Sequence, residues 1–514
     1  MNQKYLVIID VDKIQDFIFR NVKLKPIFGS SFLVSHLTSH AYCRTKRVLN
    51  HLTKKQKLID LTAGNDKYIP LFFDGGVIKI IFSKKEDAIR FVEDMQREFI
   101  NNAPAATFSH VIHEFSDFSH SILENAEKML ARIKKSKMYT IMPNTNPIFE
   151  LCQWCRTYPA NFKIQLSTNE SELLCEQCNA SFDAYKDFVS TDSDVPLKVF
   201  HKEFKEKFKC DFKSEFDEIK DKRSYLAVVK MDADDLGDKL IELTRDKKED
   251  NCVESIRVFS QKLNSEVLSL LFNSFDNIFN DDEIKKGELP LRPIIIGGDD
   301  ICFVMAGDMA IRFVLNFVEK LNHNTFLKLH AITFSIGICF VKAHYPFTLA
   351  HKLAEELLKN AKSEKPRRRD DIWHTIDWEV LHSSSFEDLS SIRRTGYTIS
   401  QGVNEFILTY KPYIFKNGDP RDFVSFLKNA KCLKGILKGS KFKGLRKIVR
   451  ENYAVSDFEF KKITSKLSKQ DMGEIKNILK GFGMENDSIW SIKNGKAYNN
   501  FLDMVELSDF IGDV

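Results

Sequence analysis

The residue types and spacing best suited to metal-ion chemistry are those of Gly297-Gly298-Asp299-Asp300. The run lies between two apolar segments, Pro-Ile-Ile-Ile before it and Ile-Cys-Phe-Val-Met after it. This pattern predicts a tight β-hairpin between buried strands with the carboxylates at its tip. Two adjacent acids in such a place repel each other unless a cation neutralises them. The glycines would let a bound triphosphate approach the backbone closely.

A second strand also ends in acids. The segment "LAVVKMDADDLGDKL" runs from a β-rich stretch into Asp232, Asp234 and Asp235. Two strands that end in carboxylates are what a Mg²⁺-dependent nucleotidyl-transfer palm needs, because its metals contact the attacking 3′-oxygen and the leaving pyrophosphate. A lone Gly-Gly-Asp-Asp is a weak signal, since Gly-Asp turns are common in hairpins. The rest of the chain therefore decides its weight.

The length of 514 residues is enough for three or four domains. Hydrophobic residues make up 43% of the chain and charged residues 29%, as in ordinary globular proteins. The net charge of +5 is mild, so local basic runs matter more than the total. No apolar stretch approaches the length of a membrane span, and Asp10 and Asp12 interrupt the N-terminal apolar run, unlike a secretory signal. The ten cysteines favour free thiols and a metal site over disulfides, and a cytoplasmic location.

The chain repeats itself. Three pairs of segments match in the same order, which predicts a duplicated domain with small insertions. The pairs, at offsets of 220, 222 and 228, are 5–12 with 225–232, 75–76 with 297–298, and 126–137 with 354–365.

The two copies differ at the acidic turn. In the first copy Val77 and Ile78 stand where the second has Asp299 and Asp300. Two apolar side chains cannot bind Mg²⁺. We therefore expect one active palm and one structural or nucleotide-holding palm.

Each copy reads as strand, helix, hairpin, helix, strand, helix, which is the ferredoxin-like βαββαβ order of an α+β fold. An amphipathic helix expected near 347–362 would place Lys362 at its end, within reach of a phosphate or simply in solvent. The alignment puts Lys134 opposite it. In the second copy strands are expected near 225–232, 292–297, 301–306 and 330–341, and further helices near 254–275 and 308–322.

Cys152, Cys155, Cys175 and Cys178 form a CxxC…CxxC pattern with 19 intervening residues. This spacing is typical of Cys₄ zinc sites. Four thiolates around Zn²⁺ stabilise a segment too small for a core of its own. The pattern predicts a closed, structural zinc site; a redox role is the main alternative.

Beyond about residue 383 the strand signals stop and helical periodicity predominates. The stretch from Lys428 to Arg450 holds nine basic residues and no acid. It either follows a phosphate backbone or forms a solvated helix face. A second basic cluster, Lys365 to Arg369, follows the Lys362 helix and either assists triphosphate binding or occupies a loop.

Taken together, the chain resembles the large palm-domain subunit of type III CRISPR effector complexes, over nearly its whole length. Matching segments are "IDVDKIQDFIF", "KMDADDLGD", "IIIGGDDICFV", "TFSIGICF" and "AEELLKNAK". The resemblance implies two palm domains, of which the second carries GGDD, an intervening zinc module and a helical C-terminal domain. The predicted boundaries are 1–148 for the degenerate first palm, 149–222 for the zinc module and helical linker, 223–382 for the catalytic palm and 383–514 for the helical domain.

The resemblance further implies synthesis of cyclic oligoadenylate from ATP in antiviral defence. Its metal ligands, for Mg²⁺ or Mn²⁺, would be Asp232, Asp299 and Asp300, and Lys362 would hold the triphosphate. Asp234 would either assist a metal or form a local hydrogen bond. The implied partners are RNA-guided effector subunits with their guide and target RNA.

One departure separates this chain from many members of that family. They begin with an HD-type nuclease domain, whereas this chain starts at the opening strand of the first palm and has no His-Asp dipeptide. It resembles a form that lacks the nuclease domain. Two alternatives therefore stay open: a freestanding cyclase of another anti-phage system, possibly a homodimer, and a non-catalytic RNA-binding scaffold subunit.

Overall fold

A computed structural model describes most of the chain. Arg367, Arg368 and Arg369, from the second basic cluster, lie outside the described residues. The described residues are 3–45, 68–137, 149–165, 171–191, 193–245, 247, 249–279, 281–366, 371–382, 387–401, 404–451, 453–484, 488–493 and 495–511.

The chain divides into two compact units, and each gathers segments that are distant in sequence. Unit 1 consists of Met1–Glu218, Asp235–Asn273 and Asp281–Cys302, and unit 2 of Ile219–Asp234, Ser274–Asn280 and Phe303–Val514.

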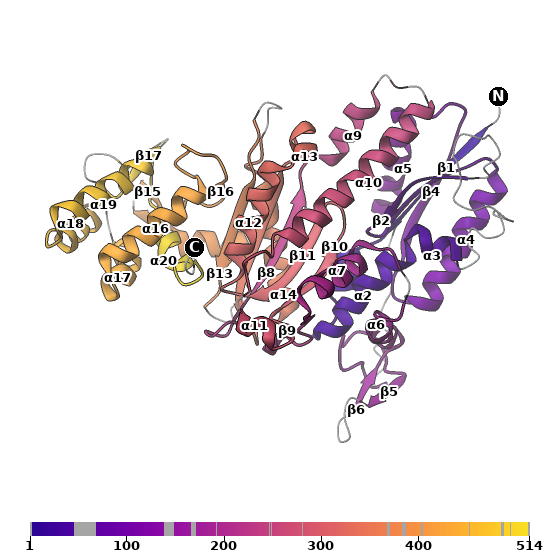
Figure 1. The fold of residues 1–514 in the computed structure, drawn as a ribbon, viewed down its shortest axis with the longest axis horizontal. Helices are drawn as coiled ribbons and strands as arrows, with labels where there is room; N and C mark the ends of the chain where they lie inside the picture. Colours follow the sequence, from indigo (N-terminus) through magenta and orange to yellow (C-terminus); the bar gives the residue numbers. More distant parts are fainter. Residues whose placement is uncertain are drawn as a thin grey trace. The chain divides into compact units, whose positions relative to one another are not determined.

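Unit 1 holds a four-stranded antiparallel sheet with the order β2-β3-β1-β4. Along the chain the elements run strand, helices, hairpin, helix, strand, helix, as the ferredoxin-like pattern predicts. Apolar residues of the sheet pack against α5, and Leu6, Val111 and Leu123 are almost fully buried there. The elements are β1 (Lys4–Val11), α1 (Ile14–Ile18), α2 (Leu24–Leu37), α3 (His40–Thr45), β2 (Tyr68–Asp74), β3 (Val77–Phe82), α4 (Lys85–Asn102), β4 (Phe108–Phe115) and α5 (His120–Ser136) (Figure 1).

A second sheet has the order β10-β11-β8-β12-β13-β16. When its first four strands are numbered along the chain, their order is 2-3-1-4, the same as in the first sheet. The predicted pair of ferredoxin-like palms is therefore confirmed. The elements are β8 (Tyr225–Ala233), α9 (Leu236–Thr244), α10 (Glu249–Asn273), α11 (Asp281–Lys285), β9 (Glu288–Leu289), β10 (Leu291–Ile296), β11 (Asp300–Ala306), α12 (Ala310–His323), α13 (Thr325–Leu329), β12 (Phe334–Lys342), α14 (Phe347–Lys362), β13 (Thr375–Val380) and β16 (Tyr413–Ile414).

A glycine in β12 fixes how closely α14 lies on the sheet. A Cβ at Gly337 would stand 2.5 Å from the carbonyl oxygen of Ala354 and 2.5 Å from the amide nitrogen of Leu358. Real side chains do not tolerate such contacts, so only glycine permits this packing. The close packing directs the C-terminal end of α14, with Lys362, toward the end of β8 in the same unit.

The structure differs from the sequence expectations in two places. The strand expected from residue 330 begins at Phe334, because α13 and a left-handed residue, Ala331 at φ 48°, precede it. Strands also continue beyond residue 383, where a small sheet with the order β14-β15-β18-β17 accompanies the helices. The elements are α15 (Leu389–Tyr397), β14 (Thr398–Gln401), β15 (Asn404–Ile407), α16 (Phe423–Leu437), α17 (Ser440–Ile448), α18 (Tyr453–Thr464), α19 (Lys469–Gly481), β17 (Ser491–Lys493), β18 (Lys496–Tyr498) and α20 (Phe501–Leu507).

The segment with the paired cysteines folds as a short hairpin followed by a helix in unit 1. No helix among the described residues is both long and apolar enough to cross a membrane. The remaining elements are β5 (Phe162–Gln165), β6 (Ser171–Leu174), α6 (Glu176–Asp187), α7 (Pro196–Phe208), β7 (Asp211–Phe212) and α8 (Phe216–Ile219).

Candidate active site and metal centre

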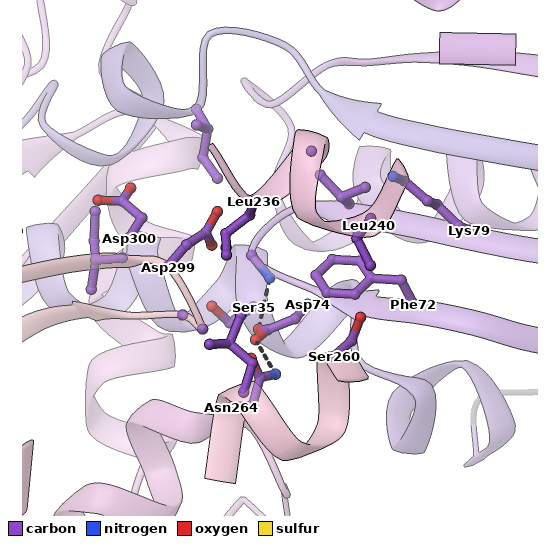
Figure 2. Close-up of a pocket in the computed structure, with 18 of the residues that line it drawn as sticks. Ser35, Phe72, Asp74, Lys79, Leu236, Leu240, Ser260, Asn264, Asp299 and Asp300 are labelled. Atoms are coloured by element: carbon purple, nitrogen blue, oxygen red, sulfur yellow. Dashed lines mark hydrogen bonds between the residues drawn. The ribbon is translucent and has the colours of Figure 1, made fainter. Parts of the chain in front are cut away.

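The GGDD run forms the turn between β10 and β11, as the sequence predicts. The turn is closed by the amide of Gly297, which donates to the carbonyl oxygen of Asp300 at 2.9 Å. Asp299 and Asp300 line a cavity of about 400 Å³ within unit 1, and Figure 2 shows both carboxylates at one side of it. Other walls are mainly apolar, with Phe72, Leu236, Leu240, Phe259 and Leu263 among the lining residues.

One of the two carboxylates is held by the first copy. The side-chain amide of Gln15, on α1, donates from Nε2 to Oδ2 of Asp300 at 3.0 Å. A neutral donor of this kind fixes the orientation of a carboxylate while leaving its charge free for a cation. The sequence analysis did not single out Gln15, since a glutamine after a strand carries no motif of its own.

A third acid lines the same cavity. Asp74 ends β2, directly before Gly75-Gly76, and is buried. Its Oδ1 accepts the amide of Gly75 at 2.7 Å, and its Oδ2 accepts Nδ2 of Asn264 at 3.2 Å (Figure 2). Burial above all, with a smaller contribution from the nearby charge of Asp299, raises the pKa of Asp74 to about 7. An acid immediately before the glycine pair of the first copy was the signal that could have found it.

Asn264 also explains one of the two glycines. A Cβ at Gly298 would stand 1.9 Å from Oδ1 of Asn264, whereas a Cβ at Gly297 would meet only the carbonyl oxygen of Asp300 at 3.6 Å. Gly298 thus leaves the space that the Asn264 side chain from α10 occupies, and an alanine there would force that side chain to move; this is a reason different from the predicted close approach of a triphosphate. Asp74, Asn264 and Gly298 form a contact chain from the first hairpin to the GGDD turn.

In unit 2, the predicted lysine and the predicted strand-end acid lie together. Nζ of Lys362 is 2.7 Å from Oδ1 of Asp232. The first copy repeats this pair in unit 1, where Nζ of Lys134 is 2.6 Å from Oδ2 of Asp10. The predicted equivalence of the two lysines is therefore confirmed, and the first palm keeps an acid and base pair although its hairpin has lost the two aspartates.

Asp234 forms local hydrogen bonds, one of the two roles left open for it. Its carboxylate oxygens accept the hydroxyls of Thr333 and Ser335, each at 2.8 Å. Burial raises the pKa of Asp234, and the two hydroxyls oppose that rise. The residue secures the end of β8 against β12.

Asp12 accepts the same kind of hydrogen bonds in the first copy, and it also pairs with Lys137 at 2.5 Å. It accepts hydrogen bonds from Thr107 at 3.1 Å and Ser109 at 2.7 Å. It is therefore the counterpart of Asp234, and Asp10 is the counterpart of the acid paired with the α14 lysine. The first-strand alignment at offset 220 was wrong by two residues; the correct offset is 222, the same as for the glycine pairs. Period-2 apolar patterns match equally well after a shift of two residues, which explains the error.

The structure thus brings the predicted residues together in two groups. Gly297, Gly298, Asp299 and Asp300 line one cavity in unit 1. The second group, Asp232 with Lys362, belongs to unit 2.

The four predicted zinc ligands converge. The Sγ atoms of Cys152, Cys155, Cys175 and Cys178 all lie within 4.8 Å of one another, and those of Cys155 and Cys175 are 3.7 Å apart. Sulfur atoms around a tetrahedral zinc at about 2.3 Å have similar separations. Hydrogen bonds from the other three thiols hold the pKa of Cys152 below its ordinary value. The cluster therefore has the donor set and spacing of a Cys₄ metal centre.

The sequence of the second palm matches a known family. Residues 225–372 match the family described as Cas10/Cmr2, second palm domain. The match covers these residues alone, and it indicates a palm domain of the Cas10/Cmr2 kind there. No curated protein matches the chain.

Solved structures resemble this chain at low sequence identity. A Csm1-Csm4 cassette in complex with pppApApA matches with 15% identity and a TM-score of 0.51, over 94% of this chain and 68% of that one. The apo Csm1-Csm4 cassette matches with 14% identity and a TM-score of 0.48, over 94% and 70%. The cassette in complex with cA4 matches with 16% identity and a TM-score of 0.42, over 71% of this chain and 53%, about half, of that one.

Proposed function

We propose that this protein is a nucleotidyl cyclase that joins ATP into cyclic oligoadenylate in type III CRISPR antiviral defence. The observation that supports it most is the position of Asp299 and Asp300 on a cavity, in a domain that matches the Cas10/Cmr2 second palm. The matched structure with pppApApA is of a Csm1-Csm4 cassette. We extend that ligand class, oligoadenylate, to the cavity of this chain.

Asp232, Asp299 and Asp300 are the proposed ligands of Mg²⁺ or Mn²⁺. Three carboxylates supply hard oxygen donors, which suit both ions. This choice of three ligands rests on the palm motifs of the sequence, because Asp232 belongs to unit 2 and the other two acids to unit 1. When bound, the metals would lower the pKa of the attacking 3′-hydroxyl and neutralise the leaving pyrophosphate.

Lys362 is the proposed triphosphate contact. Its ammonium is held by Asp232 at 2.7 Å and is partly exposed, so it can exchange part of that contact for a phosphate oxygen. A point charge on a flexible stem suits this role. Gly297 and Gly298 are also proposed to bind the substrate, through their backbone atoms.

The proposed reaction forms a bond from the 3′-oxygen of one nucleotide to the α-phosphorus of the next. The bond from that phosphorus to pyrophosphate breaks, and pyrophosphate leaves. Gln15 keeps Asp300 oriented through the hydrogen bond of 3.0 Å. The apolar walls formed by Phe72, Leu236 and Leu240 exclude water that would otherwise hydrolyse the triphosphate.

The domain boundaries and partners belong to the same proposal. Residues 1–148, 149–222, 223–382 and 383–514 would be first palm, zinc module with linker, catalytic palm and helical domain. The matched cassettes pair Csm1 with Csm4, and we propose an effector subunit of that kind, with its guide and target RNA, as partner. None of the ten cysteines is in a disulfide, which suits the proposed location in the cytoplasm, where ATP is also found.

Zn²⁺ is the proposed occupant of the Cys₄ centre, in a structural role. Cys152, Cys175 and Cys178 are buried, which leaves no open coordination position for a substrate. The indole of Trp154 packs on the cluster and meets Phe182 edge-on at 5.3 Å. The metal would secure the hairpin of β5 and β6, whose residues are mostly exposed or half-buried.

The test is incubation with labelled ATP and Mn²⁺, for the wild type and for Asp299→Asn with Asp300→Asn. We expect pyrophosphate release to fall by about 10³-fold or more in the variant, because the charges that hold the metals are lost. Asp281→Asn, an exposed acid on α11, is the matched control and should react normally. Equal activity in all three proteins would exclude this assignment of the site. Activity in the lone chain would favour the freestanding form, and activity only with partners would favour the complex.

A further inference from the structure

Unit 2 carries a basic surface that the proposed cyclase chemistry does not use. Five exposed lysines define it: Lys428 in the first half of α16, Lys438 at the C-terminal cap of α16, and Lys441, Lys443 and Lys447 on α17. None of the five has a hydrogen-bond or ion-pair partner among the residues that the structure describes. Figure 1 shows α16 and α17 in the orange part of the chain.

Two basic residues next to this surface have structural contacts, unlike the five lysines. Nζ of Lys434 donates to the carbonyl oxygen of Ser508 at 2.8 Å, and the guanidinium of Arg446 lies 3.8 Å from Glu506. Both contacts fix α16 and α17 to the C-terminal segment. The five lysines of the basic surface are exposed and make no such contact among the described residues, and no acid occurs from residue 428 to 450. Packing therefore does not explain their concentration.

A polar groove adjoins the basic surface through Lys428. Its volume is about 730 Å³, and it lies between α12 and the start of α16. The half-buried Arg312 lines it, and this guanidinium also has no partner among the described residues. The ring of Phe415 and the amides of Asn322 and Asn417 share the lining.

Acids in the groove are mostly engaged elsewhere. Asp276 pairs with Lys320 at 3.6 Å. Asp422 is buried and caps α16, since Oδ2 accepts the amide of Ser425 at 2.9 Å. Glu319 is the exposed acid of the lining. Among the charged residues that line the groove, two basic ones, Arg312 and Lys428, and one acidic one, Glu319, therefore have no ion-pair partner among the described residues.

We propose that the basic surface and its groove bind single-stranded nucleic acid. The lysines would follow the phosphates, and the groove would take an unstacked base between Phe415 and the amide side chains. A positively charged track beside an aromatic platform is the arrangement that recognises single strands. A planar guanidinium next to amides also suits a base edge or a phosphate. An acidic peptide would use the lysines but gain little from the groove.

The test is binding of a fluorescent oligouridylate to the full chain by anisotropy over a range of salt concentrations. The test variant carries four substitutions together: Lys438→Gln, Lys441→Gln, Lys443→Gln and Lys447→Gln. In it the slope of log affinity against log salt should become shallower by about 3, since each single-strand phosphate contact contributes about 0.7. The matched control replaces four exposed lysines outside the surface: Lys461, Lys466, Lys469 and Lys480. It should keep the wild-type slope. An equal loss in the control would overturn the proposal.

The groove has its own variants. Arg312→Gln and Phe415→Leu should each weaken binding by about tenfold, because the first removes a charged hydrogen-bond donor and the second an aromatic ring on which a base stacks. Glu319→Gln removes a repelling charge and should tighten binding. Thermal melting would check that each variant is folded. If polyglutamate displaced the oligonucleotide at lower concentration than unlabelled oligouridylate, or if duplex bound as tightly as single strand, the proposed ligand would be wrong.

Discussion

Gln15 and Asp300 are 285 positions apart in the chain, yet the amide of one donates to the carboxylate of the other at 3.0 Å. The first residue belongs to the opening helix of the degenerate palm, and the second to the acidic turn of its duplicate. The first copy has lost its own acids at the turn, but it supplies groups that contact the acids of the second. Asp74 makes a second connection to the turn, since Asn264, which donates to it, lies beside Gly298.

Gln15→Ala should lower metal-dependent turnover by roughly tenfold, because a hydrogen bond to a charged group contributes about 1.5 kcal/mol or more. The loss should appear mainly in kcat and in the Mn²⁺ concentration needed for half activity, since Asp300 loses its fixed orientation. Asp16→Ala, an exposed neighbour on the same helix, is the control. A variant that matched the wild type at every Mn²⁺ concentration would show that Gln15 has no positioning role.

Gly298→Ala and Gly297→Ala should differ sharply. A Cβ at 298 would lie 1.9 Å from Asn264, and one at 297 would lie 3.6 Å from its nearest neighbour. We expect Gly298→Ala to cost about 1–3 kcal/mol of unfolding free energy and Gly297→Ala well under that. Adding Asn264→Ala should restore most of the stability of Gly298→Ala. Urea unfolding gives the free energy of unfolding of the wild type, the two single variants and the double variant. Equal losses of that free energy in the two glycine variants would refute the steric explanation.

Removal of zinc should destabilise the hairpin and helix that carry the four cysteines. We expect about one zinc per chain by elemental analysis, and loss of it in Cys175→Ser. Limited proteolysis should then cut between residues 149 and 191 before the palms. Cys432→Ser, a half-buried cysteine outside the cluster, is the control. A zinc-free protein with an intact, protease-resistant segment would exclude a structural metal.

Stability should fall in mild acid because of His374. The residue is buried, its Nδ1 accepts the amide of Phe334 at 3.0 Å, and burial lowers its pKa to about 4. The unfolded chain binds this proton near pH 6.5 and the folded chain only near pH 4, so the contribution is full above about pH 6.5 and is lost as the pH falls through that window.

His374→Asn keeps an acceptor for the amide of Phe334 and removes the titration. Between about pH 7 and pH 5 it should lose about 2 kcal/mol less unfolding free energy than the wild type. His344→Asn, at an exposed position, should behave as the wild type does. Parallel pH curves for the wild type and His374→Asn would contradict the assigned pKa.

The sequence predicted the repeated palm because its signals are local. A glycine pair between apolar runs and a CxxC pair each specify a short structure by themselves, so the GGDD turn and the converging cysteines were found at the expected positions. Lys362 lies at the end of α14, where helical periodicity and the repeat predicted it, and its contact with a triphosphate stays a prediction.

What the sequence missed depends on contacts between distant segments. Asp74 and Asn264 are 190 positions apart, and neither belongs to a motif. The two strands that extend the second sheet, β13 and β16, pair only through tertiary contacts. The shift of two residues in the first-strand alignment arose because the strand pattern repeats every two residues. Side-chain partners such as Thr107 and Ser109 were needed to correct it.

The central claim is tested most directly by identifying the products of ATP by mass spectrometry. The full chain would be incubated with ATP or GTP and Mn²⁺, alone and with its RNA-loaded effector partners, beside Asp300→Asn. The account predicts cyclic oligoadenylate and pyrophosphate from ATP, and neither from the variant. Intact ATP under both conditions, or the same products from Asp300→Asn, would contradict it.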